Sequence, residues 1–350
     1  MNRTRFRVTI SKQQLLNFIV LLLFIILSGG NTVNPDIGNY KNGYRLINTI
    51  SEGSWLYYYL RNFFVGAGIS FEYFRLFLYA IGYFVLSIAN KKLANGSTVT
   101  YIFYGISLLI IDSTQTYNFV GMCFLYLAIA YLVSGTKKCR LFYILFLAIA
   151  SGFHIVFLFY IPFVFIYSRT DTKQLTKLYI WIMVIVLLVS TVVSLTGLAS
   201  LMTRLLDFAG LSSYQGYLVS RTRYGHYYPM MTHIVCCLFT YYYYKKTSNA
   251  ENQSGDMERI FFLLCLYGIF AFPFFRFQLS ISRLTRNLVL LPCLSGINYS
   301  SRDNYRRRRN AVILLLLLAC FLGYFSTYSS YMEQIVVPFF HNNWILGLHQ

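Results

Sequence analysis

Two histidines of this sequence lie where they could carry acid–base chemistry. His154 lies in the run AIASGFHIVFLFYIPF, and no Asp, Glu, Lys or Arg occurs between Leu141 and Tyr167. An imidazole enclosed in a polar pocket suits a general base, and His226 is a second candidate for that role. The alternative for His154 is a hydrogen-bonded histidine that packs between helices.

Six arginines form a second set of candidates, because a planar guanidinium pairs two phosphate oxygens at once. Contact with anionic lipid headgroups or ordinary solvation is the alternative. The carboxylates of Asp36, Glu52 and Asp112 are candidate orienting or sugar-binding groups, or else simple loop residues. The arginine candidates are Arg204, Arg221 and Arg223 in one segment and Arg276, Arg283 and Arg286 in another.

The composition shows what kind of fold must position these residues. Of 350 residues, 57% are hydrophobic and 12% are charged, whereas charged residues make up about a quarter of an ordinary soluble domain. Apolar runs near the length that crosses about 30 Å of hydrocarbon recur along the whole chain. The sequence therefore predicts an all-α, polytopic integral membrane bundle, with residues 1–350 as a single transmembrane domain.

Nine spans are expected from apolar runs, and the segment 141–167 is a special case. As one helix it would be about 40 Å long, which exceeds the hydrocarbon thickness. The amino-terminal run has a basic head, but no convincing cleavage site follows it, so we expect an uncleaved helix. The nine spans are 15–29, 70–89, 98–112, 117–134, 178–198, 229–244, 259–275, 285–299 and 310–325.

Charge distribution decides how often segment 141–167 crosses the membrane, because short loops rich in Lys and Arg stay in the cytoplasm. A single crossing places the later basic loops on different sides. Two half-spans, 141–152 and 155–167, that turn at SGFH keep all of them inside. The predicted cytoplasmic loops are near 91–92, 137–140, 169–177, 245–258 and 302–309.

This topology gives about eleven membrane segments, with the amino terminus inside and His154 at an outer turn. Large outer loops are expected at 30–69 and 199–228, and residues 55–64, WLYYYLRNFF, are expected to form an interfacial aromatic helix. The candidate arginines then lie on the outer side, against the usual charge bias, so they need another reason to be there.

Several other functions find no support in the sequence. The net charge of +19 comes from basic residues between apolar runs, which set orientation, so we expect no nucleic-acid partner. The seven cysteines show no CxxC or Cys/His spacing, and we expect no metal or disulfide framework. Walker, Rossmann and DxD-type signatures are absent, so no nucleotide cofactor is expected.

Residues 115–163 contain, in order, an outer turn, an Ala-rich span, a short basic loop, a small-residue half-helix and the pair Phe153–His154. Three further motifs are NPDIGNYKNGY, ISRLTRNLVLLPC and IVVPFFHNNW. These segments resemble the EpsG-type branch of the Wzy polysaccharide-repeat polymerases, and residues 115–163 are the strongest match. One departure is Tyr117, which stands where the family usually has an Arg, so only neutral hydrogen bonds from Gln115 and Asn118 remain there.

The resemblance implies glycosyl transfer between undecaprenyl-diphosphate-linked oligosaccharides at the outer face of a bacterial cytoplasmic membrane, for capsule, exopolysaccharide or O-antigen. Arg221, Arg223, Arg283 and Arg286 would bind the diphosphate and His154 would activate the acceptor, without a metal. A chain-length regulator and a flippase of the same pathway are expected partners. The alternatives are a flippase-type transporter of the same lipid, an O-antigen ligase and a membrane acyltransferase.

Overall fold

A computed structural model of the chain describes residues 11–46, 53–136, 138–167, 225–248, 256–275, 279–300, 305–325 and 332–348, together with isolated positions between 177 and 204. Every regular element in these residues is helical, as predicted. The fold begins with the helices α1 (Lys12–Gly30), α2 (Ile37–Arg45), α3 (Trp55–Gly66), α4 (Phe71–Ala94), α5 (Thr98–Ser107), α6 (Leu109–Thr114), α7 (Thr116–Val133) and α8 (Cys139–Phe153).

The rest of the chain is built from helices of more varied length. They are the 3-10 helix η1 (Ile155–Tyr160), α9 (Phe163–Tyr167), α12 (Tyr227–Ser248), α13 (Asp256–Gly268), η4 (Ile269–Ala271), α14 (Phe272–Phe275), η5 (Leu279–Ser282), α15 (Arg283–Arg286), α16 (Leu290–Ser300), α17 (Tyr305–Gly323), the π-helix η7 (Met332–Val336) and α19 (Val337–His341).

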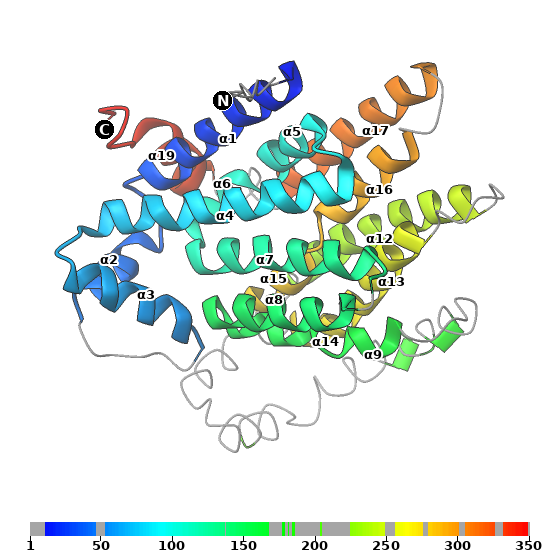
Figure 1. Cartoon of the computed structure of the whole chain (residues 1–350), viewed down its shortest axis with the longest axis horizontal. Coiled ribbons are helices and arrows are strands. Elements are labelled where there is room, and N and C mark those ends of the chain that lie inside the picture. The colour runs from blue at the N-terminus through cyan, green and yellow to red at the C-terminus, as the bar shows by residue number, and fades with distance from the viewer. Residues whose placement is uncertain are drawn as a thin grey trace, which may run out of the picture.

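The helices pack as a bundle in which α1, α4, α7 and α8 lie side by side in that order (Figure 1). Helix α7 is apolar around its whole circumference, which is typical of a helix surrounded by other helices, and most of its residues are buried. Helices α12, α13, α16 and α17 form the other side of the bundle (Figure 1). The core therefore lies around α7, whose first turn faces the candidate residues.

Among the described residues, four helices are long and apolar enough to cross a membrane: Lys12–Gly30, Phe71–Ala94, Thr116–Val133 and Asp256–Phe275. Three shorter apolar helices, Cys139–Phe153, Ile155–Ile166 and Arg309–Gly323, accompany them. The prediction of about eleven membrane segments is therefore not confirmed, although the all-helical bundle is. Most of the predicted span 178–198 and the loop 199–228 lies outside the described residues.

Two predicted spans were wrong in detail. The predicted span 98–112 is broken at Leu108, where the backbone (φ −129°, ψ −29°) leaves the helical region. The hydroxyl of Ser107 donates to the Phe103 carbonyl oxygen (2.7 Å), a bond that bends helices. The predicted span 285–299 is also divided, because α15 ends at Arg286 and α16 begins at Leu290.

The turn predicted at SGFH is present. Helix α8 ends at Phe153, and His154 has extended backbone angles (φ −155°, ψ 124°). The Tyr143 hydroxyl donates to the Tyr160 carbonyl oxygen (2.9 Å), whereas in a continuous helix these residues would be about 25 Å apart. Gly121 of α7 lets this turn approach, because a Cβ there would lie 2.2 Å from Cε2 of Phe157.

Contacts between helix ends divide the bundle into two ends. At one end the Asn298 side chain donates to the Leu93 carbonyl oxygen (2.8 Å), and Lys92 lies 4.6 Å from the Tyr131 ring centroid. At the other end Arg75 donates to the Ser113 carbonyl oxygen (2.9 Å). We call the end with Asn298 and Lys92 the basic end, because it carries Lys91, Lys92, Lys138, Arg140 and Lys245. We call the end with Arg75 the site end, and it contains Gly30, Gln115, His154 and Arg283.

The polar segment after α1 covers the site end. Its helix α3 packs against α8, and the Ile155 amide donates to the Gly53 carbonyl oxygen (2.8 Å). Trp55, Tyr59 and Phe63 lie four residues apart and are exposed, while Tyr57 and Arg61 are buried. The predicted aromatic helix at 55–64 is therefore present with one exposed aromatic face, and its place at a membrane interface stays a prediction.

Candidate functional site

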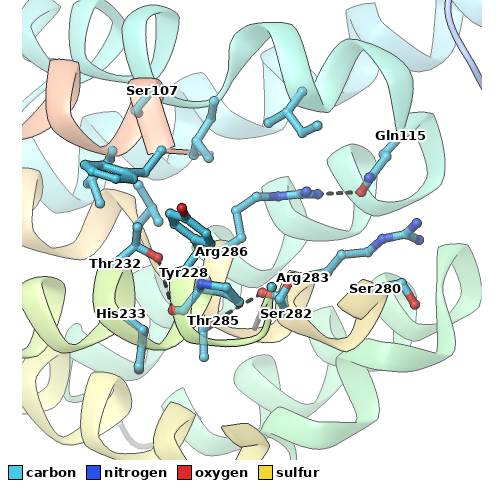
Figure 2. A pocket seen from close by; sticks show the side chains of 17 residues that line it. Ser107, Gln115, Tyr228, Thr232, His233, Ser280, Ser282, Arg283, Thr285 and Arg286 are labelled. Atoms are coloured by element: carbon cyan, nitrogen blue, oxygen red, sulfur yellow. Dashed lines mark hydrogen bonds between the residues drawn. The ribbon is translucent and has the colours of Figure 1, made fainter. Parts of the chain in front are cut away.

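Arg283 and Arg286 are the centre of the candidate site. Their spacing of three residues places both side chains on one face of α15, and Figure 2 shows the two guanidinium groups extending in the same direction, toward the side where Gln115 lies. Both line a cavity of about 470 Å³ at the site end. The sequence therefore identified two arginines that the fold brings together.

Arg286 is held by partners far away in the sequence. It donates to the Gln115 side-chain oxygen, and its Nη2 lies 3.7 Å from Oδ1 of Asp112. Asp112 is 1% exposed and accepts a hydrogen bond from the Tyr104 hydroxyl (3.2 Å). The Asp112 carboxylate therefore helps to orient the Arg286 guanidinium. It does not bind the phosphate itself, because two negative groups repel each other.

The larger cavity is lined by both polar and apolar side chains. Hydroxyl groups of Thr232, Ser280 and Ser282 line it beside the two arginines (Figure 2). The break at Leu108 brings Leu108 and Ile111 to the lining, and apolar residues of two other segments also belong to it. These are Val289, and Leu322 and Phe325 of the segment 305–325. Such a cavity can accept a molecule that joins an anionic group to a hydrocarbon chain.

A second cavity, of about 200 Å³, lies beside the first and shares Gln115 and Arg283 with it. His154 and Asp36 line this second cavity, together with side chains from α2 and α7. Burial raises the pKa of Asp36, and the Arg283 charge opposes that effect. Three candidates that are far apart in sequence, Asp36, His154 and Arg283, therefore meet in one place.

His154 has two ring contacts that compete for one lone pair. Its Nδ1 lies 3.3 Å from the backbone amide nitrogen of Val156, and its Nε2 lies 3.3 Å from Nη1 of Arg283. Both neighbours only donate, and a neutral imidazole has a single unprotonated nitrogen, so only one contact at a time is a hydrogen bond. A lone pair at Nε2 makes His154 a base toward the cavity, and a lone pair at Nδ1 makes it a donor.

The other predicted residues lie elsewhere. His226 is buried and its ring lies 4.1 Å from that of Tyr227, but it lines neither cavity. Arg204 is exposed. The remaining candidates lie outside the described residues: Arg221, Arg223, Arg276 and Glu52.

Tyr117, the residue for which the resemblance would expect an arginine, belongs to a cluster of tyrosine rings. The Tyr117 ring contacts those of Tyr40 (4.8 Å) and Tyr57 (3.9 Å), both tilted against it, and Tyr117 lines the smaller cavity. Gln115 compensates in part, because it binds Arg286 directly. The sequence did not predict this cluster of Tyr40, Tyr57 and Tyr117, because it depends on contacts between α2, α3 and α7.

A buried amide pair fixes the arginine segment against α7. The side chains of Asn118 and Asn287 exchange two hydrogen bonds (2.9 and 3.2 Å), and both are at most 1% exposed. Asn287 follows Arg286 directly. The pair therefore helps to set where both guanidinium groups point.

Replacing Asn118 by Ala is expected to lower the free energy of unfolding by about 1–3 kcal/mol, because it leaves the buried Asn287 amide without a partner. Thermal unfolding in detergent would measure this. The double variant Asn118→Ala/Asn287→Ala should cost less than the sum of the single changes. Additive costs would show that the pair does not stabilise the fold as a unit.

The helical bundle points to a multi-pass membrane protein with a cavity that two arginines line. The chain belongs to the EpsG family, whose family model matches residues 14–341. No curated protein matches the chain, and no solved structure does. Membership of this family suggests a Wzy-like polysaccharide polymerase.

Proposed function

We propose that this protein polymerises undecaprenyl-diphosphate-linked oligosaccharide repeats, and that it transfers the growing glycan to the incoming lipid-linked repeat. The observation that carries the proposal is the pair Arg283 and Arg286, which shares a partly apolar cavity of about 470 Å³. The donor needs both features, because it joins a diphosphate to an isoprenoid chain.

In this reaction the acceptor hydroxyl oxygen forms a bond to the anomeric carbon of the growing chain, and the bond from that carbon to the lipid diphosphate breaks. Negative charge develops on the leaving diphosphate, where fixed cations stabilise the transition state most. Arg283 and Arg286 supply those cations, and Asp112 and Gln115 orient Arg286. The hydroxyl proton passes to His154, whose Nε2 lies 3.3 Å from Arg283.

The orientation proposed for the membrane follows from the charges at the two ends of the bundle. Lys91, Lys92, Arg140 and Lys245 lie at the basic end, and such loops stay in the cytoplasm. We therefore propose that the protein lies in a bacterial cytoplasmic membrane, with the amino terminus inside and the site end outside. Lipid-linked repeats would then reach the site after a flippase has translocated them, and a chain-length regulator would act on the product.

The rival functions differ in the product they would make. A flippase would move the lipid-linked oligosaccharide without covalent change and would need a basic cavity at each end of the bundle. Both cavities that Arg283 lines lie at the site end, as the polymerase requires. A ligase would transfer a finished glycan once to another acceptor, and an acyltransferase would require an acyl donor.

Reconstituted protein supplied with purified lipid-linked repeats tests the proposal. A polymerase gives a ladder of products that differ by one repeat, together with release of one undecaprenyl diphosphate for each bond formed. The double variant Arg283→Ala/Arg286→Ala should give no ladder while it still folds. A single product in the presence of a second acceptor would support the ligase, and translocation without a ladder would support the flippase.

A further inference from the structure

We infer that the cavity of about 200 Å³ beside Arg283 is a saccharide subsite, which binds the terminal pyranose ring of the acceptor repeat through the face of Tyr117 and the side chains of Asp36 and Asn39. This inference rests on the proposed function and specifies where its second substrate binds.

The side chains that line the cavity are those that bind sugars. Asp36 and Asn39, at the start of α2, offer such groups. Gln115 and Asn118, at the start of α7, also line the cavity, but their side chains bind Arg286 and Asn287. Carboxylate and amide oxygens accept hydrogen bonds from sugar hydroxyls, and amide nitrogens donate to them. The Asp36 side chain makes no capping hydrogen bond to α2, and Asp36 lines the cavity.

Aromatic rings form one side of the cavity. Tyr40 and Tyr117 both line it, and their ring centroids are 4.8 Å apart. Tyr57 lies behind Tyr117, 3.9 Å from it, and is 2% exposed. A ring held in this way presents a fixed electron-rich face, against which the C–H bonds of a pyranose can pack.

The size of the cavity suits a single sugar ring. Its volume of about 200 Å³ corresponds to about seven water molecules at about 30 Å³ each, which is close to the volume of one hexopyranose. The rest of the acceptor would extend outward past Asn39, which is exposed.

The position of the cavity places the sugar where the reaction needs it. Arg283 and Gln115 border both cavities, and His154 lines only the smaller one. A sugar bound against Tyr117 would therefore have a hydroxyl near His154 on one side and the diphosphate held by Arg283 on the other. The donor and acceptor would meet at Arg283.

The probe for this inference is the oligosaccharide released by mild acid from the lipid-linked repeats of the cells that make this protein. It lacks the lipid diphosphate, so its binding reports the saccharide subsite. Binding to the full chain in nanodiscs would be measured by saturation-transfer NMR and by titration. Asn39→Ala and Tyr117→Leu should each weaken binding by about tenfold, because each removes a direct contact.

Thr232→Val is the matched comparison, because Thr232 lines only the larger cavity and its hydroxyl donates to the Pro229 carbonyl oxygen (3.0 Å). It should leave oligosaccharide affinity unchanged. Since Asn39 is exposed, its replacement is not expected to affect folding, which a thermal melt checks. The inference is overturned if the wild type shows no saturable binding, if neither Asn39→Ala nor Tyr117→Leu weakens it, or if Thr232→Val weakens it equally.

A failure of the proposed function gives a different result. If the wild type binds the oligosaccharide and Asn39→Ala weakens that binding, but no ladder forms from lipid-linked repeats, the saccharide subsite stands and the polymerase proposal does not.

Discussion

Replacing Arg283 by Ala is expected to lower the rate of repeat polymerisation by about 10²–10³-fold, the usual cost of removing one donor aimed at developing charge. Arg283 is expected to matter more than His154, because it borders both cavities and lies 3.3 Å from the His154 ring. Its loss would remove the positive charge that stabilises the leaving diphosphate. It would also remove the one side chain that is proposed to lie between the two substrates.

Arg283→Lys separates charge from geometry. Lysine keeps a positive charge but lacks the planar fork that pairs two phosphate oxygens, so activity between that of the wild type and that of the Ala variant is expected. Initial rates with purified lipid-linked repeats, measured at several donor concentrations, would give kcat and KM for each variant. A fall mainly in kcat would show that the guanidinium acts in the transition state.

Arg140→Ala is the matched control for this prediction. Arg140 is also an arginine, but it is exposed and lies at the basic end, away from both cavities. It should polymerise at the wild-type rate. If Arg283→Ala also kept that rate in a folded protein, Arg283 would have no part in the chemistry.

The site could be predicted from the sequence only where local pattern or charge decided it. The turn at His154 followed from the length of segment 141–167 and from the sidedness of basic loops. Arg283 and Arg286 were identified because arginines on the predicted outer side run against the usual charge bias. Long apolar runs likewise predicted α1, α4 and α7, because burial of apolar side chains sets their positions whatever their exact partners.

The rest depends on contacts between residues far apart in the chain. Gln115 meets Arg286 across 171 positions, and Asn118 meets Asn287 across 169. No local pattern indicates such pairs. The break at Leu108, which opens the larger cavity, interrupts an apolar run that reads as one span. The buried Arg75, which donates to the Ser113 carbonyl oxygen, was missed because its role is to tie helix ends together.

The pKa of His154 determines what pH dependence to expect. Burial, reinforced by the charges of Arg283 and Arg286, lowers that pKa to about 3, so the free protein holds a neutral imidazole at neutral pH. A base must be unprotonated, and its contribution is lost as pH falls through its pKa. The profile of kcat/KM, which reports the free enzyme, should therefore show no loss from His154 between about pH 5 and 8.

Bound substrate changes this expectation in a definite direction. The diphosphate offsets the positive charges of both arginines, so the pKa of His154 rises in the complex and the imidazolium is favoured at higher pH. The acid limb of kcat, which reports the complex, should therefore lie at higher pH than any acid limb of kcat/KM. The His154→Gln variant should lack this difference between the two profiles.

His154→Ala is expected to slow polymerisation by about 10²-fold, the lower end of the range that general bases contribute. The matched comparison is His154→Gln, because the two ring contacts allow either a base or a donor. A glutamine amide can donate a hydrogen bond but takes up no proton near neutral pH. If His154 is the base, Gln should be as slow as Ala, and added imidazole should restore activity to the Ala variant in proportion to its unprotonated fraction. Wild-type turnover by His154→Gln would instead assign His154 a donor role, with the proton leaving to solvent.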